Sequence, residues 1–129
     1  MAQVAVEQLA FARPGGEGEW PSGGRAIDLV HLARQTFGER ALEEEILAMF
    51  RSQILSIKSR LRDAQADDRK TIAHGLKGSS RSVGAFALAD AAAVLELTPA
   101  SDAQVREIER RIDDVIDLRD GMRIDTGSA

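Results

Sequence analysis

The chain has 129 residues, of which 43% are hydrophobic, 29% are charged and only 4% are aromatic, and its formal net charge is −4. This length suits a single domain, and the composition is that of an ordinary globular protein with an aliphatic core. The absence of cysteine excludes a disulfide framework, a thiolate metal site and a cysteine nucleophile, and the negative charge argues against a general nucleic-acid binder.

Residues 1–24 form an N-terminal extension that ends in a linker-like stretch. Positions 14–24 hold five glycines and two prolines, together with the single tryptophan, Trp20. Met1–Ala12 carries Glu7 and no basic residue, so it does not have the charged start of a signal peptide. No apolar run approaches the 18 residues of a membrane span. We therefore expect a cytoplasmic protein that has no membrane partner.

Helical periodicity begins at Ile27 and gives two helices before residue 65. The first is short, from Ile27 to Phe37, and Gly38 is expected to end it. The second runs from about residue 39 to residue 64. Its apolar residues recur three and four positions apart along one stripe: Leu42, Ile46, Met49, Phe50, Ile54, Ile57 and Leu61.

Three further helices are predicted from residue 67 to the C-terminal tail. One starts with Asp67 or Asp68 as its N-cap and ends at Gly84, and the next covers residues 86–97 before Thr98-Pro99 breaks it. Residues 101–104 (Ser-Asp-Ala-Gln) resemble a capping box that opens the last helix, which is expected to end near Gly121. We thus predict an all-α fold, an antiparallel four-helix bundle over residues 25–123 with the short first helix lying across it and a polar tail at 124–129.

The most informative stretch lies in the third predicted helix, around His74. Lys77 and Gly78 follow this histidine by three and four residues, and side chains at these spacings project back over the first residue on the same helical face. Lys77 can therefore hold a positive charge beside the imidazole, while Gly78 leaves the approach to the ring open. A neutral histidine is a good nucleophile near pH 7, so this arrangement can carry a phosphoryl group whose charge the lysine stabilises.

Two glycines in this helix lower its stability. Gly75 and Gly78 together should destabilise the helix by roughly 2 kcal/mol relative to alanine. A segment selected only for packing would more often carry alanine, which this chain otherwise favours. Either a neighbouring helix or a partner protein is therefore expected to approach the backbone here.

These residues resemble the histidine-containing phosphotransfer (HPt) domains of bacterial phosphorelays. The family pattern is a histidine followed by x-Leu-Lys-Gly-Ser/Ala-Ser/Ala, with a glycine ten residues after the histidine. Every position is filled, by His74, Leu76, Lys77, Gly78, Ser79, Ser80 and Gly84. The pattern does not ask for Gly75, and the first 24 residues have no counterpart in it.

The resemblance implies a role for each residue of the motif. His74 would be the phosphoacceptor, Lys77 would stabilise the phosphoryl charge and Gly78 would give clearance to a partner. Partner-binding positions would be Lys70, Gly75 and Arg81, and supporting positions would be Ser79, Ser80 and Gly84. The expected partners are receiver domains of response regulators and of hybrid histidine kinases.

The resemblance also sets expectations about cofactors and activity. Mg²⁺ would sit on the partner receiver and no metal or cofactor on this chain, which would act as a monomer. The chain has no Gly-Lys-Ser/Thr phosphate loop and no room for a kinase's nucleotide-binding domain, so it should have no kinase or ATPase activity of its own. A metal site is not indicated, because His31 and His74 lie on different predicted helices and do not have metal-ligand spacing. Glu43-Glu44-Glu45 is interpreted as a solvated helix face and not as a metal site.

Two alternatives remain open at this stage. The first is a helical adaptor that binds receiver domains without transferring phosphate, although such a protein need not keep the full set of motif residues.

The second concerns the acid-free stretch from Arg69 to Arg81, which contains Lys70 and Lys77. It is either a docking surface for an acidic partner or a solvated helix face, and for Arg69 the two interpretations are equally favoured. His31 lacks the flanking lysine and glycine and is interpreted as a structural or surface residue.

Overall fold

The computed structural model describes residues 25–128, with side chains up to Met122, and the predicted extension at 1–24 lies outside these residues. Five helices follow one another: α2 (Leu29–Gln35), α3 (Arg40–Leu61), α4 (Ala66–Val83), α5 (Phe86–Leu97) and α6 (Asp102–Ser128). The described part of the chain contains no strand, which confirms the predicted all-α class. Its helices include none that is long and apolar enough to cross a membrane.

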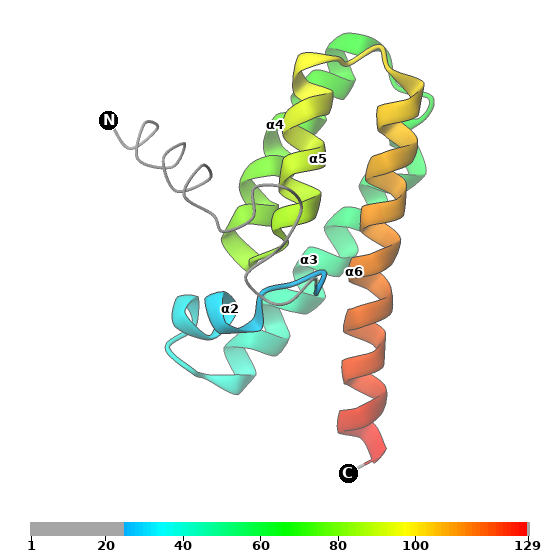
Figure 1. Cartoon of the computed structure of the whole chain (residues 1–129). Coiled ribbons are helices and arrows are strands. Elements are labelled where there is room, and N and C mark those ends of the chain that lie inside the picture. Colours follow the sequence, from blue (N-terminus) through cyan, green and yellow to red (C-terminus); the bar gives the residue numbers. More distant parts are fainter. Residues whose placement is uncertain (1–24, 129) are drawn as a thin grey trace, which may run out of the picture.

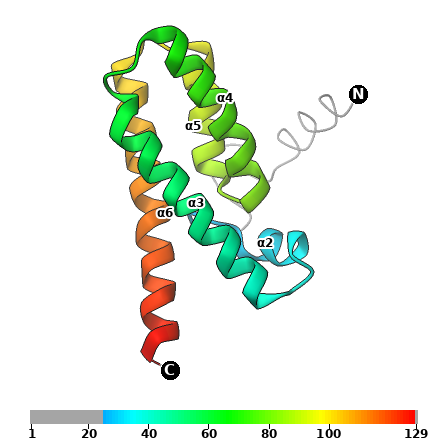
Figure 2. The same ribbon diagram turned by 180° about the vertical axis from the view of Figure 1, so that it is seen from behind.

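The four long helices form the predicted bundle, with α2 beside the end at which α3 begins (Figures 1 and 2). The buried Arg119 of α6 pairs with Glu44 of α3. Three more exposed ion pairs join α3 or its C-cap Arg62 to α6, and their residue numbers fall along α3 as they rise along α6, so the two helices are antiparallel: Arg62–Glu109, Lys58–Asp113 and Arg51–Asp120. Partly exposed pairs of this kind contribute at most about 1 kcal/mol each, so they indicate the register more than they supply stability.

The core is aliphatic, as the composition predicts. On α3 the buried positions recur at spacings of three and four and are Leu47, Phe50, Ile54, Ile57 and Leu61. Met49 is 69% exposed, so its predicted place in the apolar stripe is wrong. It is one position away from Phe50, which turns it about 100° out of the stripe.

Helix α5 matches its predicted span and is buried mainly through small side chains. Its buried residues are Leu88, Ala89, Ala91, Ala92 and Leu95. Alanines bring the backbone of α5 close to its neighbours, and the views in Figures 1 and 2 show α4 and α5 running side by side. This close packing sets the distance between side chains that the two helices direct at each other.

The connection into α6 confirms half of the predicted capping box. Ser101 Oγ accepts a hydrogen bond from the Gln104 backbone N–H at 3.0 Å, as an N-cap serine should. The Gln104 side chain does not return to this cap but donates to the carbonyl of Ala91 at 2.9 Å. The residue that would have closed the box therefore ties α6 to α5.

Gly84 has a conformation and a position that only glycine fits. It ends α4 with φ at +90°, in the left-handed region. Its carbonyl accepts a hydrogen bond from the Asp28 N–H at 2.8 Å, and a Cβ at Gly84 would lie 2.8 Å from the Asp28 carbonyl oxygen. Asp28 in turn caps α2 through the His31 N–H. The glycine thus ends α4, as predicted, and seats the segment that leads into α2.

Several predicted helix ends are wrong. Helix α2 covers Leu29–Gln35, which is shorter at both ends than predicted, and α3 ends at Leu61, three residues early. Helix α4 begins at Ala66, with Gln65 as its N-cap, so Asp67 and Asp68 lie inside its first turn, where their charges favour the helix dipole. Helix α6 continues past Gly121 to Ser128, so the tail predicted at 124–129 is helical over most of its length. An exposed glycine raises the free energy of a helix without ending it.

We predict that Gly84→Ala will lower the free energy of unfolding by about 2 kcal/mol or more, because the left-handed backbone and the contact with Asp28 both oppose a Cβ. Gly121→Ala is the matched control, since a Cβ there meets no atom within 4 Å, and it should raise stability by about 1 kcal/mol. Urea unfolding of both variants checks the pair. Equal stability of Gly84→Ala and wild type would contradict the assignment.

Candidate functional site

His74 lies on the solvent-facing side of α4. Its side chain is 71% exposed, whereas its neighbours Ala73 and Leu76 are in the core. The ring is anchored on one edge only, with Nδ1 2.8 Å from Oε2 of Glu96 on α5. The edge that carries Nε2 lies on the other side of the imidazole and is not part of this contact.

Glu96 joins His74 and Lys77 through its two carboxylate oxygens. While Oε2 contacts the ring, Oε1 accepts a hydrogen bond from Lys77 Nζ at 2.7 Å. The side chains of Lys77 and Glu96 are 21% and 20% exposed, so this ion pair is better shielded from water than the ring itself. Lys77 is one turn from His74, at the predicted spacing, but the group that it contacts is a carboxylate that the sequence analysis did not identify.

The surroundings of Glu96 determine its charge and the tautomer of His74. The hydrogen bond from Lys77 is the largest influence and lowers the pKa of Glu96, desolvation opposes it, and the hydrogen bond from His74 lowers the pKa further. The carboxylate is therefore ionised at neutral pH and can only accept hydrogen bonds. Nδ1 must then be the donor, so a neutral His74 ring carries its lone pair on Nε2.

The two glycines beside His74 are exposed and face open space. A Cβ built at Gly75 or at Gly78 would meet no atom within 4 Å among the described residues, apart from the helix's own local backbone. Neither glycine is therefore required for packing between helices. Of the two explanations that the sequence left open for a close approach, the approach of a partner protein is the one that this surface favours.

Lys70 and Arg81 lie one turn before and two turns after His74, and this register places them on the same side of α4. Lys70 is exposed and Arg81 is half-buried. Both predicted partner-binding cations are therefore placed where a protein that covers the imidazole would meet them.

Arg69 does not belong to this surface. Its side chain is buried, and its guanidinium donates to the carbonyl oxygens of Leu61 and Arg62 at the end of α3. It also donates to Pro99 and pairs with Asp102, which ties the end of α3 to the start of α6. Neither interpretation that the sequence left open for Arg69 is right, because this side chain faces neither a partner nor solvent and satisfies helix-end carbonyls.

The remaining motif residues contribute to the structure of α4. Ser79 Oγ accepts a hydrogen bond from the Gln53 amide of α3 at 3.0 Å, and the fully buried Ser80 hydroxyl has no hydrogen-bond partner among the described residues. Gly84 lies ten residues beyond His74, or about 15 Å along the helix axis. His31 packs its ring edge against Phe86, with centroids 5.2 Å apart, and its Nε2 is 3.2 Å from the Ser82 carbonyl, which fits the structural role expected for it.

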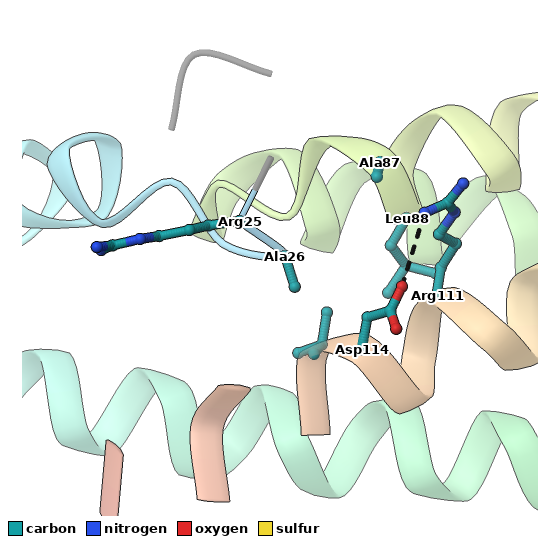
Figure 3. A pocket seen from close by; sticks show the side chains of 7 residues that line it. Arg25, Ala26, Ala87, Leu88, Arg111 and Asp114 are labelled. Carbon is teal, nitrogen blue, oxygen red and sulfur yellow. Dashed lines mark ion pairs between the residues drawn. The ribbon is translucent and has the colours of Figure 1, made fainter. Parts of the chain in front are cut away.

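Figure 3 shows a small cavity of about 50 Å³ elsewhere in the bundle. It lies between the segment before α2 and helices α5 and α6, and Arg111 and Asp114 form an ion pair across its edge at 3.6 Å. The cavity has room for little more than water and does not include His74. Residues 25–122 also contain no cluster of three or more His, Asp or Glu side chains that could hold a metal ion.

We predict that Glu96→Gln will change the pH dependence of stability. A lowered carboxyl pKa stabilises the fold above the ordinary glutamate value of 4.5, and this stabilisation is lost as the pH falls through the lowered pKa. The free energy of unfolding of wild type should therefore exceed that of the variant by about 1 kcal/mol at pH 7, which is the size of a partly exposed charged hydrogen bond. This difference in stability should shrink below pH 4.5. Urea unfolding from pH 7 to about pH 3 measures it; a difference that is constant with pH would contradict the assignment.

Comparison with known proteins adds one finding to this geometry. The family model described as the Hpt domain matches residues 39–121, which is more than half of the chain and includes helices α3 to α5 and most of α6. No curated protein and no solved structure matches the chain. The matched region contains the exposed imidazole, the cation one turn away and the carboxylate that joins them. Because the match covers more than half of its residues, the chain belongs to the Hpt domain family, whose members carry phosphoryl groups on histidine in phosphorelays.

Proposed function

We propose that this protein accepts a phosphoryl group on Nε2 of His74 from the phospho-aspartate of one receiver domain and passes it to the aspartate of a second. The observation that carries the proposal is the anchoring of His74 through Nδ1 to an ionised carboxylate, which leaves Nε2 unprotonated in the neutral ring and exposed to a partner. The family match supports histidine phosphotransfer as the general role.

The first transfer uses the lone pair of Nε2 as the nucleophile. Nε2 attacks phosphorus, the P–N bond forms, and the bond between phosphorus and the aspartate oxygen breaks, which leaves the partner with a free carboxylate. The ring keeps its proton on Nδ1 and becomes positively charged. Glu96 lies 2.8 Å from that nitrogen and stabilises the charge as it develops. Transfer to the second receiver reverses these steps.

Lys77 supplies positive charge beside the ring, one turn along α4. Its ammonium has three N–H donors, of which the hydrogen bond to Glu96 uses one. The others remain available to phosphoryl oxygens without loss of the ion pair. In this proposal Glu96 is a positioning residue that holds both the ring and the lysine, and Mg²⁺ is held by the receiver.

The docking surface combines basic and apolar side chains around the ring. Leu97, the residue after Glu96 on α5, is 83% exposed. Together with Lys70 and Arg81 on α4, it offers apolar contact and positive charge to a receiver whose phosphoacceptor region is acidic. We propose a cytoplasmic monomer that binds receivers of response regulators and of hybrid histidine kinases and has no kinase activity of its own.

A phosphotransfer panel tests this function. Receiver domains charged with labelled phosphate are mixed with wild type, with His74→Gln and with His31→Gln, a matched control at the other histidine. We expect acid-labile, base-stable label on wild type and on His31→Gln and none on His74→Gln. Circular dichroism confirms that each variant is folded.

Two results would contradict the proposal. Label on His74→Gln equal to that on wild type would show that the phosphoacceptor lies elsewhere. Binding of receivers with no label on any variant would show that the protein is an adaptor, the alternative function that the sequence leaves open.

A further inference from the structure

Helix α5 is apolar on more sides than the bundle covers. Only Asp90 and Glu96 among its residues are charged. A helix that is hydrophobic all round is normally covered all round. Although α5 packs against α4 and α6, Val94 and Leu97 are 46% and 83% exposed. Part of the apolar surface of α5 therefore has no cover among the described residues.

The exposed apolar side chains lie on one face of α5. Positions 87, 90, 94 and 97 follow one another at spacings of three and four, so they form a stripe along the helix, turned away from the buried Leu88 and Leu95. Apart from Asp90 this stripe is apolar, and we call Ala87, Val94 and Leu97 the outer face of α5. The exposed positions of α6, by contrast, are mostly charged: Asp102, Arg106, Arg110, Asp113, Asp114 and Asp117.

The chain enters the bundle at the start of this outer face. The Asp28 N–H donates to the Gly84 carbonyl at 2.8 Å, shortly before α5 begins. Ala26 lines the small cavity of Figure 3 together with Ala87, the first residue of the outer face. The point at which the extension at 1–24 joins the bundle is therefore fixed beside α5.

The first twelve residues of the chain are apolar enough to pack against such a face. Glu7 is their only charged side chain, and most of the others are hydrophobic: Met1, Ala2, Val4, Ala5, Val6, Leu9, Ala10, Phe11 and Ala12. Residues 13–24 join this segment to the bundle, and a Gly-rich chain of that length has a root-mean-square span of roughly 19 Å. The outer face is about 15 Å long at the helical rise per residue, so all of it lies within reach.

The tether favours this segment over a segment from another molecule. A short flexible tether gives its cargo a local concentration on the order of millimolar, which a free protein in solution rarely reaches. The segment and the outer face also both lose contact with water when they pack together, and that burial of apolar surface drives the association.

We propose that residues 1–12 pack against the outer face of α5 in the same chain and cover Val94 and Leu97. This contact is separate from the chemistry at His74, and the inference does not rest on the proposed phosphotransfer function. Leu97 also belongs to the docking surface proposed for receivers. A bound receiver and the segment therefore compete for this one side chain.

Paramagnetic relaxation, measured by NMR on the full chain, tests the contact. The chain has no cysteine, so Ala5→Cys gives a nitroxide label a single attachment point within the segment. The double variant Val94→Ser/Leu97→Ser alters the outer face. Its matched control is Val30→Ser/Met49→Ser, which alters exposed side chains on α2 and α3. Circular dichroism confirms that each variant is folded.

We expect the nitroxide to act on α5 selectively. Backbone amides of residues 87–97 should lose most of their signal intensity, while those of Ser52 and Ser59, exposed on α3, should keep theirs. Val94→Ser/Leu97→Ser should restore the α5 signals because it removes the apolar surface, and the control variant should not. Isotope-labelled protein without the nitroxide, mixed with spin-labelled protein that carries no isotope, should show no loss because the contact lies within one chain.

Three results would overturn the inference. Full intensity at residues 87–97 in the spin-labelled chain would show that the segment does not reach α5. An equal loss of intensity in Val94→Ser/Leu97→Ser would show that the outer face does not make the contact. The same loss in the mixed sample would show that a second copy supplies the segment. None of these results bears on the labelling of His74, which the phosphotransfer panel tests separately.

Discussion

The close packing of α5 against α4 is the constraint on which the site depends. Alanines at buried positions of α5, among them Ala89 and Ala92, let the two backbones approach. At that separation one glutamate side chain spans the gap and contacts both a histidine and a lysine on the facing helix. With larger residues in α5, the motif on α4 would keep its spacing but would lose its carboxylate partner.

The position of Glu96 in α5 has an electrostatic cost. It lies in the last turn of the helix, which carries no basic residue, and a negative charge there is unfavourable to the helix dipole. Lys77 and His74 offset this cost, and the lowered pKa of Glu96 reports that they do. The same contacts fix which ring nitrogen is a donor, so a local electrostatic balance also determines which edge of His74 is available for chemistry.

The basic stretch of α4 divides into residues with different tasks. Arg69 holds the end of α3 and the α5–α6 connection, and Lys77 is paired within the site. Lys70 and Arg81 lie on the His74 side of α4 and are the cations that we propose for partner binding. The sequence shows a stretch of like charges in which Arg69 cannot be distinguished from the other cations. Its burial in the structure identifies it as a structural residue.

Local signals in the sequence were sufficient for the helices and for the motif. The apolar periodicity of α3, the left-handed glycine at position 84 and the serine cap at position 101 act over a few residues, and the structure shows each of them. Glu96 is different, because it is 22 residues from His74 and reaches it only through the packing register of two helices. Its one sequence signal was its charge in a nearly apolar helix, and that signal names no partner.

We propose that Glu96 holds Nδ1 of His74 and leaves Nε2 to carry the phosphoryl group. NMR of the protein with nitrogen-labelled histidine side chains, phosphorylated by a receiver domain, tests it most directly. We expect coupling between phosphorus and Nε2, with the Nδ1 proton retained. Coupling between phosphorus and Nδ1 would contradict it, because that nitrogen could not then donate to Glu96.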